Sequence, residues 1–243
     1  SFYNSCQKVY VPAHNIIEEL KEIGIQPERL TLWQRGIDLS LFNPEKANQE
    51  YIQGITKNDK PNILFASRLV WEKNVQTLID IYNQLKKSKI DYNLIIAGDG
   101  AAKQEAQEMM PSAIFLGKLN HEELSKLYAS ADVFVFTSTS ETYGNVVIEA
   151  LASGLPCVIA NGGGSASLIE HGRTGYKCLP NNALEYVYFI QKILSDNSIR
   201  QEFRKEGLAY VNKLDWGKLA DTYFEDIQEL ASEPINTFAW ASN

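Results

Sequence analysis

The chain has 243 residues, and 44% of them are hydrophobic, which is enough for one large core or for one core and part of a second. Its 23 lysines and arginines stand against 30 aspartates and glutamates, a net charge of −7, and the absence of any basic block argues against a nucleic-acid partner. No apolar run approaches the roughly 18 residues of a membrane-spanning helix. We therefore expect a cytoplasmic protein, at most peripheral to a membrane.

The first part of the chain, residues 1–58, predicts one incomplete β-α-β unit followed by a polar connection. The predicted strand, helix, strand and turn-rich linker cover residues 8–12, 14–24, 29–36 and 43–62. A unit of this size has no core of its own. Because the chain begins with Ser1 rather than Met, we expect residues 1–58 to be the remnant and hinge of a preceding domain in a longer enzyme.

Residues 59–231 alternate short apolar runs with amphipathic runs. Predicted strands cover 62–67, 92–98, 113–117, 132–138, 156–160 and 174–178, and the intervening helices include 74–87, 120–130, 145–153 and a short one near 165–170. Strands this apolar, each followed by a helix, indicate a parallel sheet covered on both faces. We expect a doubly wound, Rossmann-like α/β domain with trailing helices over 183–196, 198–213 and 216–232, and an irregular tail over 232–243.

Ligands of open parallel sheets bind beyond the carboxyl ends of the strands, so the loops there hold the candidate site. Arg68 and Lys73 follow the strand over 62–67, five positions apart in the loop. A planar guanidinium and a mobile ammonium suit a diphosphate. Two solvated surface charges beside Glu72 are the alternative explanation.

Two carboxylates, Glu141 and Glu149, stand eight positions apart around a predicted helix start. Glu141 falls in the loop and Glu149 beyond the first helical turn, so the pair could bracket an elongated ligand rather than touch. Gly144 allows a close backbone approach, and the amides of Asn145 and Val146 would face an oxygen of a phosphate or sugar. Ionised carboxylates accept hydrogen bonds from vicinal hydroxyl groups. Alternatively, Glu149 is an exposed residue of a surface helix and Glu141 is a loop charge, and neither binds a ligand.

Two glycine runs are less specific. The run 162–164 follows a strand and fits either an anion-wrapping loop or a tight turn without a ligand. The "AGDG" run at 97–100 lacks the full dinucleotide-binding pattern. The three histidines lie far apart and no D-x-D pair occurs, so we expect no protein-held metal and no cofactor.

In order and spacing, "SRLVWEKN", "AGDG", the stretch from "FLGKLNHEELSK" to "VIANGGG", and "GRTGY" resemble the donor-binding half of the family-4 retaining glycosyltransferases of GT-B fold. The resemblance implies that Arg68 and Lys73 neutralise the diphosphate of a nucleotide-sugar. It implies that Glu149 accepts the ribose hydroxyls and that Glu141 faces the donor sugar. Gly144, Asn145 and Val146 would supply backbone amides, and the backbone of Gly117, Lys118 and Leu119 would line the nucleobase.

The segment "LTLWQRGIDLSLFNP" looks like the hinge of the subgroup that includes sulfolipid synthases and transferases acting on lipid or glycan acceptors. Two departures stand out. The acid after the glycine run is delayed to Glu170, which leaves its role open. The family's amino-terminal domain, with the acceptor site and a catalytic histidine, has no counterpart here, and His14 does not match that histidine.

These features predict a metal-independent transferase that moves a sugar from a UDP-, GDP- or ADP-sugar to a lipid or glycan acceptor with retention of configuration. The isolated chain should bind the nucleotide but transfer nothing. A sugar-nucleotide epimerase or phosphorylase-like enzyme of the same fold is one alternative. A non-catalytic nucleotide-binding module is another.

Overall fold

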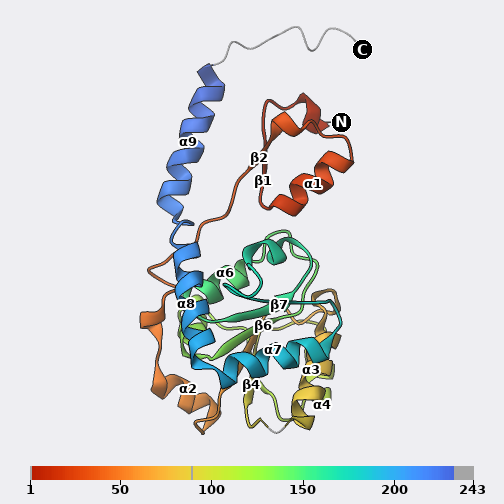
Figure 1. The fold of residues 1–243 in the computed structure, drawn as a ribbon, viewed down its shortest axis with the longest axis vertical. Helices are drawn as coiled ribbons and strands as arrows, with labels where there is room; N and C mark the ends of the chain where they lie inside the picture. The colour runs from red at the N-terminus through yellow and green to blue at the C-terminus, as the bar shows by residue number, and fades with distance from the viewer. Residues whose placement is uncertain (1, 89, 233–243) are drawn as a thin grey trace.

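The computed structural model describes residues 2–88 and 90–232 and divides into an α/β body and a smaller amino-terminal segment (Figure 1). The body contains a six-stranded sheet in the order β5-β4-β3-β6-β7-β8, with every neighbouring pair parallel. Its strands are β3 Asn62–Ala66, β4 Asn93–Ala97, β5 Ile114–Gly117, β6 Val133–Phe136, β7 Cys157–Ala160 and β8 Gly175–Cys178. The predicted doubly wound α/β fold is confirmed.

Helices cover both faces of this sheet (Figure 1). They are α3 Val75–Lys87, α4 Lys103–Met109, α5 His121–Ser130, α6 Asn145–Ala152, α7 Ala183–Ser195 and α8 Asn197–Val211, and the predicted short helix is the 3-10 turn η5 Gly164–Leu168. Local signals explain the boundaries. The side chain of Asn120 accepts from the Glu123 amide at 2.9 Å, and the Glu123 carboxylate accepts from the Asn120 amide at 3.1 Å, which closes a capping box at the start of α5.

The alternation of side chains along each strand builds two separate cores. In β3, Ile63 and Phe65 belong to the cluster covered by α3, α4 and α7, whereas Leu64 and Ala66 belong to the cluster covered by α5 and α6. All four residues are buried. A strand that is buried on both faces has a continuous hydrophobic sequence. The strands of this sheet could therefore be predicted from the sequence.

The strand order creates one topological switch point. From β3 the chain first winds outward through β4 and β5, and then returns to the other side of β3 through β6, β7 and β8. β3 and β6 are neighbours, and the loops that follow them lead to opposite sides of the sheet. In open α/β sheets, the crevice between such loops is where ligands bind.

The turn-rich linker expected over 43–62 is wrong in part, because helix α2, Gln49–Thr56, lies within it, after the 3-10 turn η3 Pro44–Lys46. The Asn48 side chain caps the helix by accepting from the Tyr51 amide at 2.8 Å. Ile52 is buried, and Ile55 packs against the same core cluster. The apolar side chains of Tyr51, Ile52 and Ile55 all contact this cluster. They are too few, among many polar residues, for the sequence to show a helical period.

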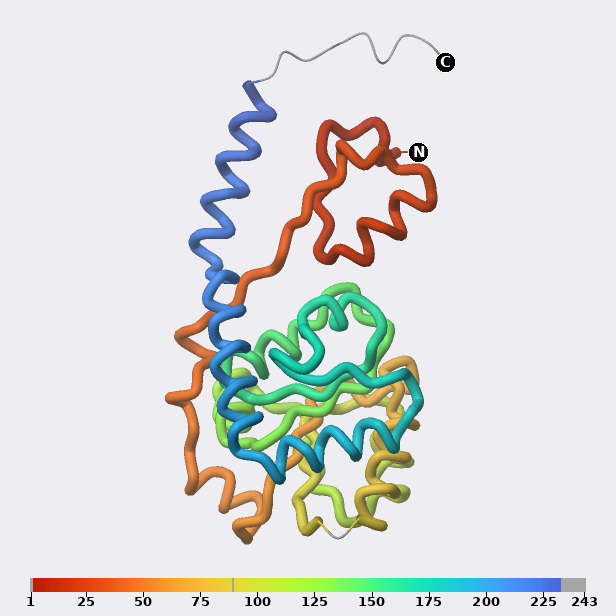
Figure 2. Tube along the Cα trace, in the orientation of Figure 1, coloured from red at the N-terminus to blue at the C-terminus, as the bar shows by residue number. Residues whose placement is uncertain are grey.

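The amino-terminal segment holds the predicted β-α-β unit: β1 Val9–Val11, α1 His14–Glu22 and β2 Leu30–Leu32, with 3-10 turns η1 Phe2–Ser5 and η2 Pro27–Arg29. β1 and β2 pair in parallel. Figure 2 shows the connection from this segment running beside the chain that leaves α8. The final helix α9, Trp216–Ser232, extends along the segment, and Tyr223 packs its ring against Tyr10 and Trp33.

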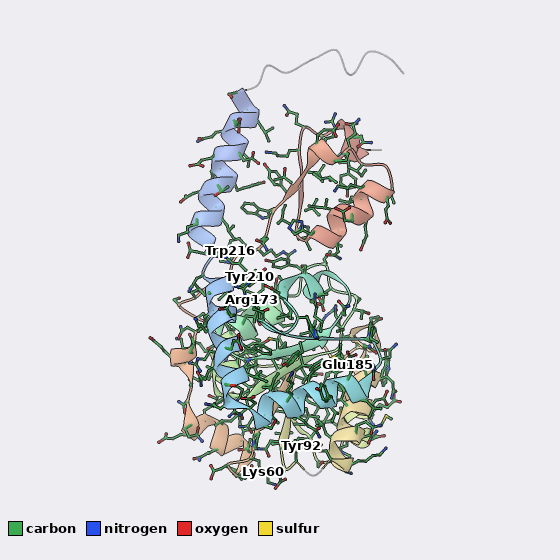
Figure 3. All side chains as sticks on the ribbon, viewed as in Figure 1. Lys60, Tyr92, Arg173, Glu185, Tyr210 and Trp216 are labelled. Carbon is green, nitrogen blue, oxygen red and sulfur yellow. The ribbon has the colours of Figure 1, made fainter. Side chains whose placement is uncertain are left out.

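A loop at the carboxyl edge of the sheet contacts the hinge that leaves the amino-terminal segment, because the Tyr143 hydroxyl, after β6, donates to the Arg35 carbonyl at 3.0 Å. Lys60 and Tyr92 precede β3 and β4 and lie at the far end of the body, whereas Tyr210 and Trp216 flank the junction of α8 and α9 next to the segment (Figure 3). Within residues 2–88 and 90–232, no helix has the length and apolar character to cross a bilayer. The tail, with Phe238 and Trp240, lies outside the described residues.

Candidate functional site

Two adjoining cavities open at the switch point. The smaller, which we name the cation cavity, has a volume of roughly 230 Å³ and is lined by Arg35, Ser67, Arg68, Lys73 and the loop from Glu141 to Val146. The larger, the apolar cavity, has roughly 460 Å³ and is lined by the ends of β3 and β4 together with Lys118, Leu119, Leu124 and Val146. Ser67, Arg68 and Val146 line both cavities. Together they form one elongated site with a charged end and an apolar end.

Lys73 and Glu141 meet in the cation cavity. Lys73 lies on the 3-10 turn η4, Trp71–Lys73, and is only 8% exposed. Its Nζ is 2.6 Å from Oε1 of Glu141, and its carbonyl accepts a hydrogen bond from the Thr137 hydroxyl at 3.1 Å. The loops after β3 and β6 are thus tied together by an ion pair that the sequence placed in one site but did not predict as a contact.

Arg68 points to the same cavity without such a partner. It is exposed, and it makes no ion pair with any acid in residues 2–88 and 90–232. The alternative of a solvated pair with Glu72 therefore does not hold for Lys73, which is buried and paired with Glu141. Arg68 remains free to bind an anion.

The "AGDG" run explains the shape of the loop that carries Arg68. Gly98 and Gly100 adopt positive φ, and a Cβ at either position would overlap the carbonyl of Ser67 or Leu69. The Leu69 amide also donates to the Asp99 carbonyl at 2.9 Å. These glycines let the end of β4 press against the loop after β3. The dinucleotide motif is absent, yet Gly98 and Asp99 line the apolar cavity.

The amino end of α6 forms one wall of the cation cavity. Gly144, its N-cap, has φ +96°, and no side chain caps the helix. A Cβ on Gly144 would come within 2.6 Å of the Ser165 Cβ, so only glycine fits. Asn145 and Val146 line the cavity at the first turn, where helix amides lack partners and the helix dipole is positive. The sequence predicted both the helix start and this wall.

Glu149 lies one turn further along α6, beyond Val146. The Tyr128 hydroxyl donates to its Oε2 at 3.2 Å. Burial raises the pKa of Glu149 above its ordinary value, and the Tyr128 hydrogen bond and the nearby His121 oppose that shift. A half-buried carboxylate held by one tyrosine keeps acceptor capacity for further hydroxyl groups.

The predicted nucleobase residues lie at the carboxyl end of β5, of which Gly117 is the last residue. Lys118 and Leu119 line the apolar cavity. Gly117 has φ +73°, and its carbonyl accepts from the Gly98 amide at 2.7 Å, which joins the ends of β5 and β4. The three residues therefore adjoin the apolar end of the site.

The glycine run 162–164 packs against the loop that carries Glu141. A Cβ on Gly163 would lie 2.5 Å from the Thr139 carbonyl, and one on Gly164 would overlap that of Thr142. The Gly164 amide donates to the Glu141 carbonyl at 2.6 Å. The run thus positions Glu141, which favours the tight-turn interpretation. Glu170 is exposed and ion-paired with Arg173 at 3.0 Å.

Several lining residues were not among the predicted site residues, among them Arg35, Ser67, Gly98 and Leu124. Ser67 and Gly98 are the last residues of predicted strands, so the rule that ligands gather at carboxyl ends could have found them. Leu124 is an apolar position of a predicted helix and carries no distinguishing signal. Arg35 lies outside the α/β repeat, in the hinge segment before it.

The sequence profile of the family described as Glycosyl transferases group 1 matches residues 47–209. Among curated proteins, the sulfoquinovosyl transferase SQD2 of Arabidopsis thaliana is 34% identical over 215 residues, which is 85% of this chain and 41% of that protein. A GDP-mannose-dependent alpha-mannosyltransferase of Corynebacterium glutamicum is 36% identical over 174 residues, 71% of this chain and 40% of that protein. The chain spans about two fifths of the length of these relatives.

Solved structures share the fold. A glycosyltransferase from Rickettsia africae superposes with a TM-score of 0.85 at 20% identity, covering 96% of this chain and 67% of that one. Anabaena HepE in complex with UDP and glucose superposes with a TM-score of 0.79 at 21% identity, covering 92% and 63%. Since the profile match spans two thirds of the chain, including the six-stranded sheet and every predicted site residue, the chain belongs to the group 1 glycosyl transferases.

Proposed function

We propose that this chain is the donor-binding part of a retaining glycosyltransferase that uses a nucleotide-sugar. The observation that carries the proposal is the elongated site at the switch point. Its charged end brings Arg68, Lys73 and the amino end of α6 to one cavity, and its apolar end has the size and lining that suit a base. In this assignment the diphosphate occupies the cation cavity and the nucleobase occupies the apolar cavity.

The charges of the site fit the chemistry of glycosyl transfer. As the bond between the sugar and the diphosphate breaks, negative charge grows on the leaving diphosphate. Lys73 and the free amides of α6 are held in place by the fold before the reaction, with Arg68 beside them, so they stabilise that charge with little reorganisation. Groups of this kind contribute about 3 to 4 kcal/mol each in other enzymes. Glu141, held by Lys73, lies where it can face the donor sugar.

Glu149 is assigned to the ribose. Glu149 lines neither cavity itself, but it stands three residues after Val146 on α6, and Val146 lines both cavities. The Tyr128 hydroxyl orients one carboxylate oxygen and leaves the other to accept from sugar hydroxyls.

The acceptor is proposed to be a lipid or a glycan. Support comes from the relatives, which include an alpha-monoglucosyldiacylglycerol synthase from Streptococcus pneumoniae, 32% identical over 173 residues. We place the enzyme in the cytoplasm, peripheral to the membrane that holds such an acceptor. The acceptor site and the catalytic histidine would lie in a preceding domain, whose last β-α-β unit is residues 2–36.

The direct test is calorimetric titration of the chain with UDP, GDP, ADP and NAD in the presence of EDTA. Saturable binding of one nucleoside diphosphate, and not of NAD, is the expected result, and it would name the base. Binding that depends on a divalent cation would contradict the metal-independent site. No binding of any diphosphate would favour a non-catalytic module.

Transfer activity separates the remaining alternatives. The chain should move no sugar to any acceptor by itself, and the polypeptide with its preceding domain should form a product of the donor's anomeric configuration, read by NMR. Conversion of the nucleotide-sugar without an acceptor would instead indicate an epimerase or a phosphorylase-like enzyme.

A further inference from the structure

Arg35 brings a third cation to the site from outside the α/β body. It lies between β2 and Ile37, in the hinge that joins the amino-terminal segment to the body. Its side chain is exposed and lines the cation cavity together with Arg68 and Lys73.

The backbone at Arg35 is fixed on both sides. The Tyr143 hydroxyl donates to the Arg35 carbonyl at 3.0 Å, and the amide of Ile37 donates to the Leu214 carbonyl at 3.0 Å. Gly36 lies against Trp216, where a Cβ would come within 2.6 Å of the indole ring. The hinge therefore holds the arginine at the mouth of the cavity.

The guanidinium also has a fixed neighbour on the ligand side. Its central carbon lies 5.9 Å from the centroid of the Tyr143 ring, within the range of a cation–π contact. Tyr143 precedes Gly144, the N-cap of α6, so the contact holds Arg35 beside the residue that leads into this helix, and both line the cation cavity.

The charge balance of the cation cavity calls for an anion. Lys73 already has one acid partner, Glu141, at 2.6 Å, which balances part of the positive charge of the cavity. Neither Arg35 nor Arg68 makes an ion pair with an acid in the part of the chain that the structure describes. Two uncommitted guanidinium groups match the two negative charges of a diphosphate diester, and each can bind phosphate oxygens in a bidentate manner.

The order of the two arginines along the site assigns each to a phosphate. Arg68 lines both cavities and so lies beside the junction, next to the first phosphate after the ribose. Arg35 lines the cation cavity beyond that junction. We propose that Arg35 binds the distal phosphate of the nucleotide, so that the hinge makes the site selective for nucleoside diphosphates over nucleoside monophosphates. This inference rests on the proposed nucleotide-binding function.

The test compares diphosphate and monophosphate of one base on the 243-residue chain. Affinities of wild type, Arg35→Ala and Arg35→Lys are measured by calorimetry, directly for the diphosphate and by displacement for the monophosphate. We expect Arg35→Ala to weaken diphosphate binding about tenfold and monophosphate binding less than twofold, and Arg35→Lys to restore part of the loss. Lys205→Ala, an exposed charge on α8 that lines neither cavity, is the matched control and should change neither affinity.

Each other outcome overturns the proposal in a recognisable way. Equal losses for the two nucleotides would mean that Arg35 acts by supporting the Tyr143 loop rather than by touching the phosphate. Unchanged diphosphate affinity in Arg35→Ala would remove Arg35 from the site and leave the proposed function standing. If the wild-type chain binds no nucleoside diphosphate, the proposed function fails, and the assignment of Arg35 fails with it.

Discussion

The α/β body and the amino-terminal segment differ in how they hold together. The body has two continuous apolar clusters, one on each face of its sheet. In residues 2–36 the buried apolar side chains are Val11, Ala13 and Ile25, and α1 buries none. The segment instead rests on α9, through rings of Tyr223, Tyr10 and Trp33 and through the contacts of Asp226 with Lys8 and Tyr10.

This difference shows which residues of the site depend on the position of the amino-terminal segment and which do not. Arg68, Lys73, Glu141 and Glu149 all stand on elements of the body, whose core fixes them. Arg35 stands on the hinge, whose position depends on the junction between the two regions. The donor site should therefore survive perturbation of the segment, but not perturbation of the body or of its tight loop contacts.

The largest expected effect is on the core of the body. Phe134 is fully buried in β6 and stacks on Phe136. Phe134→Ala should lower the free energy of unfolding by about 3 to 5 kcal/mol, because it removes the transfer energy of the ring and leaves a cavity. Urea denaturation measures the change. A loss below 1 kcal/mol would contradict a core that is packed at this position.

The next effect concerns the loop contact that positions Glu141. Gly164→Ala puts a methyl group onto the Thr142 carbonyl, and overpacking of this kind costs about 1 to 3 kcal/mol. Because the two loops must separate, nucleotide binding should be lost even where the chain stays folded. Calorimetry and thermal melting record the two effects separately.

Gly54→Ala is the matched control for this substitution. Gly54 lies exposed in α2 with nothing within 4 Å of its added Cβ. Alanine there should raise stability by up to about 1 kcal/mol, since glycine is a poor helix former. Equal behaviour of the two variants would mean that the contact between the loops is not tight.

A smaller effect is expected at Glu149. Glu149→Ala should weaken nucleotide binding by about 1 to 3 kcal/mol, because the ribose hydroxyls lose a charged acceptor. Burial raises the pKa of Glu149, so wild-type binding should weaken as the pH falls through that raised pKa and the carboxylate takes up a proton. Calorimetric titrations of both proteins between pH 5 and pH 8, with pH 8 as the reference, measure the loss of affinity in the variant and the pH dependence of the wild type.

Glu149→Gln is the control for this pH dependence. The glutamine amide does not titrate, so any pH dependence of nucleotide affinity that remains in this variant comes from the nucleotide phosphate. The difference between the affinity curves of wild type and variant comes from Glu149. The raised pKa also means that ionised Glu149 lowers the stability of the folded state above that pKa, so the glutamine variant should melt no lower than wild type at pH 7. Parallel pH curves for the two proteins would remove Glu149 from the ribose position.

The smallest effect on the body is expected from Tyr223→Ala. The substitution removes ring contacts with Tyr10 at 5.0 Å and with Trp33 at 4.6 Å, between centroids. Hydrogen exchange in β1 and β2 should rise several-fold, while the main unfolding transition stays within about 0.5 kcal/mol, because the body shares none of these contacts. A large loss of global stability would show that the two regions fold as one unit.

Much of the secondary structure could be predicted from the local sequence pattern. The strands β3, β4, β6 and β7 are continuous apolar runs, and α3 and α5 show a helical period with clear ends, so chain-local chemistry fixes their type and approximate bounds. The same local reasoning placed Gly144 at the start of α6 and grouped Arg68 and Lys73 in one loop. It failed over 43–62, where α2 buries a short apolar face among polar residues.

Long-range placement could not be predicted from those patterns. Strand order determines that the loops after β3 and β6 are neighbours, and this order is a property of the whole sheet rather than of any one segment. The contact of Lys73 with Glu141 and the role of the 162–164 glycines as a loop contact follow from it. Arg35 reaches the site through contacts of the hinge with Tyr143 and with the junction of α8 and α9. The sequence alone determined which elements form and which residue types end them, because those depend on neighbours along the chain. The tertiary structure decided which of these residues share a cavity, because that depends on how distant segments pack.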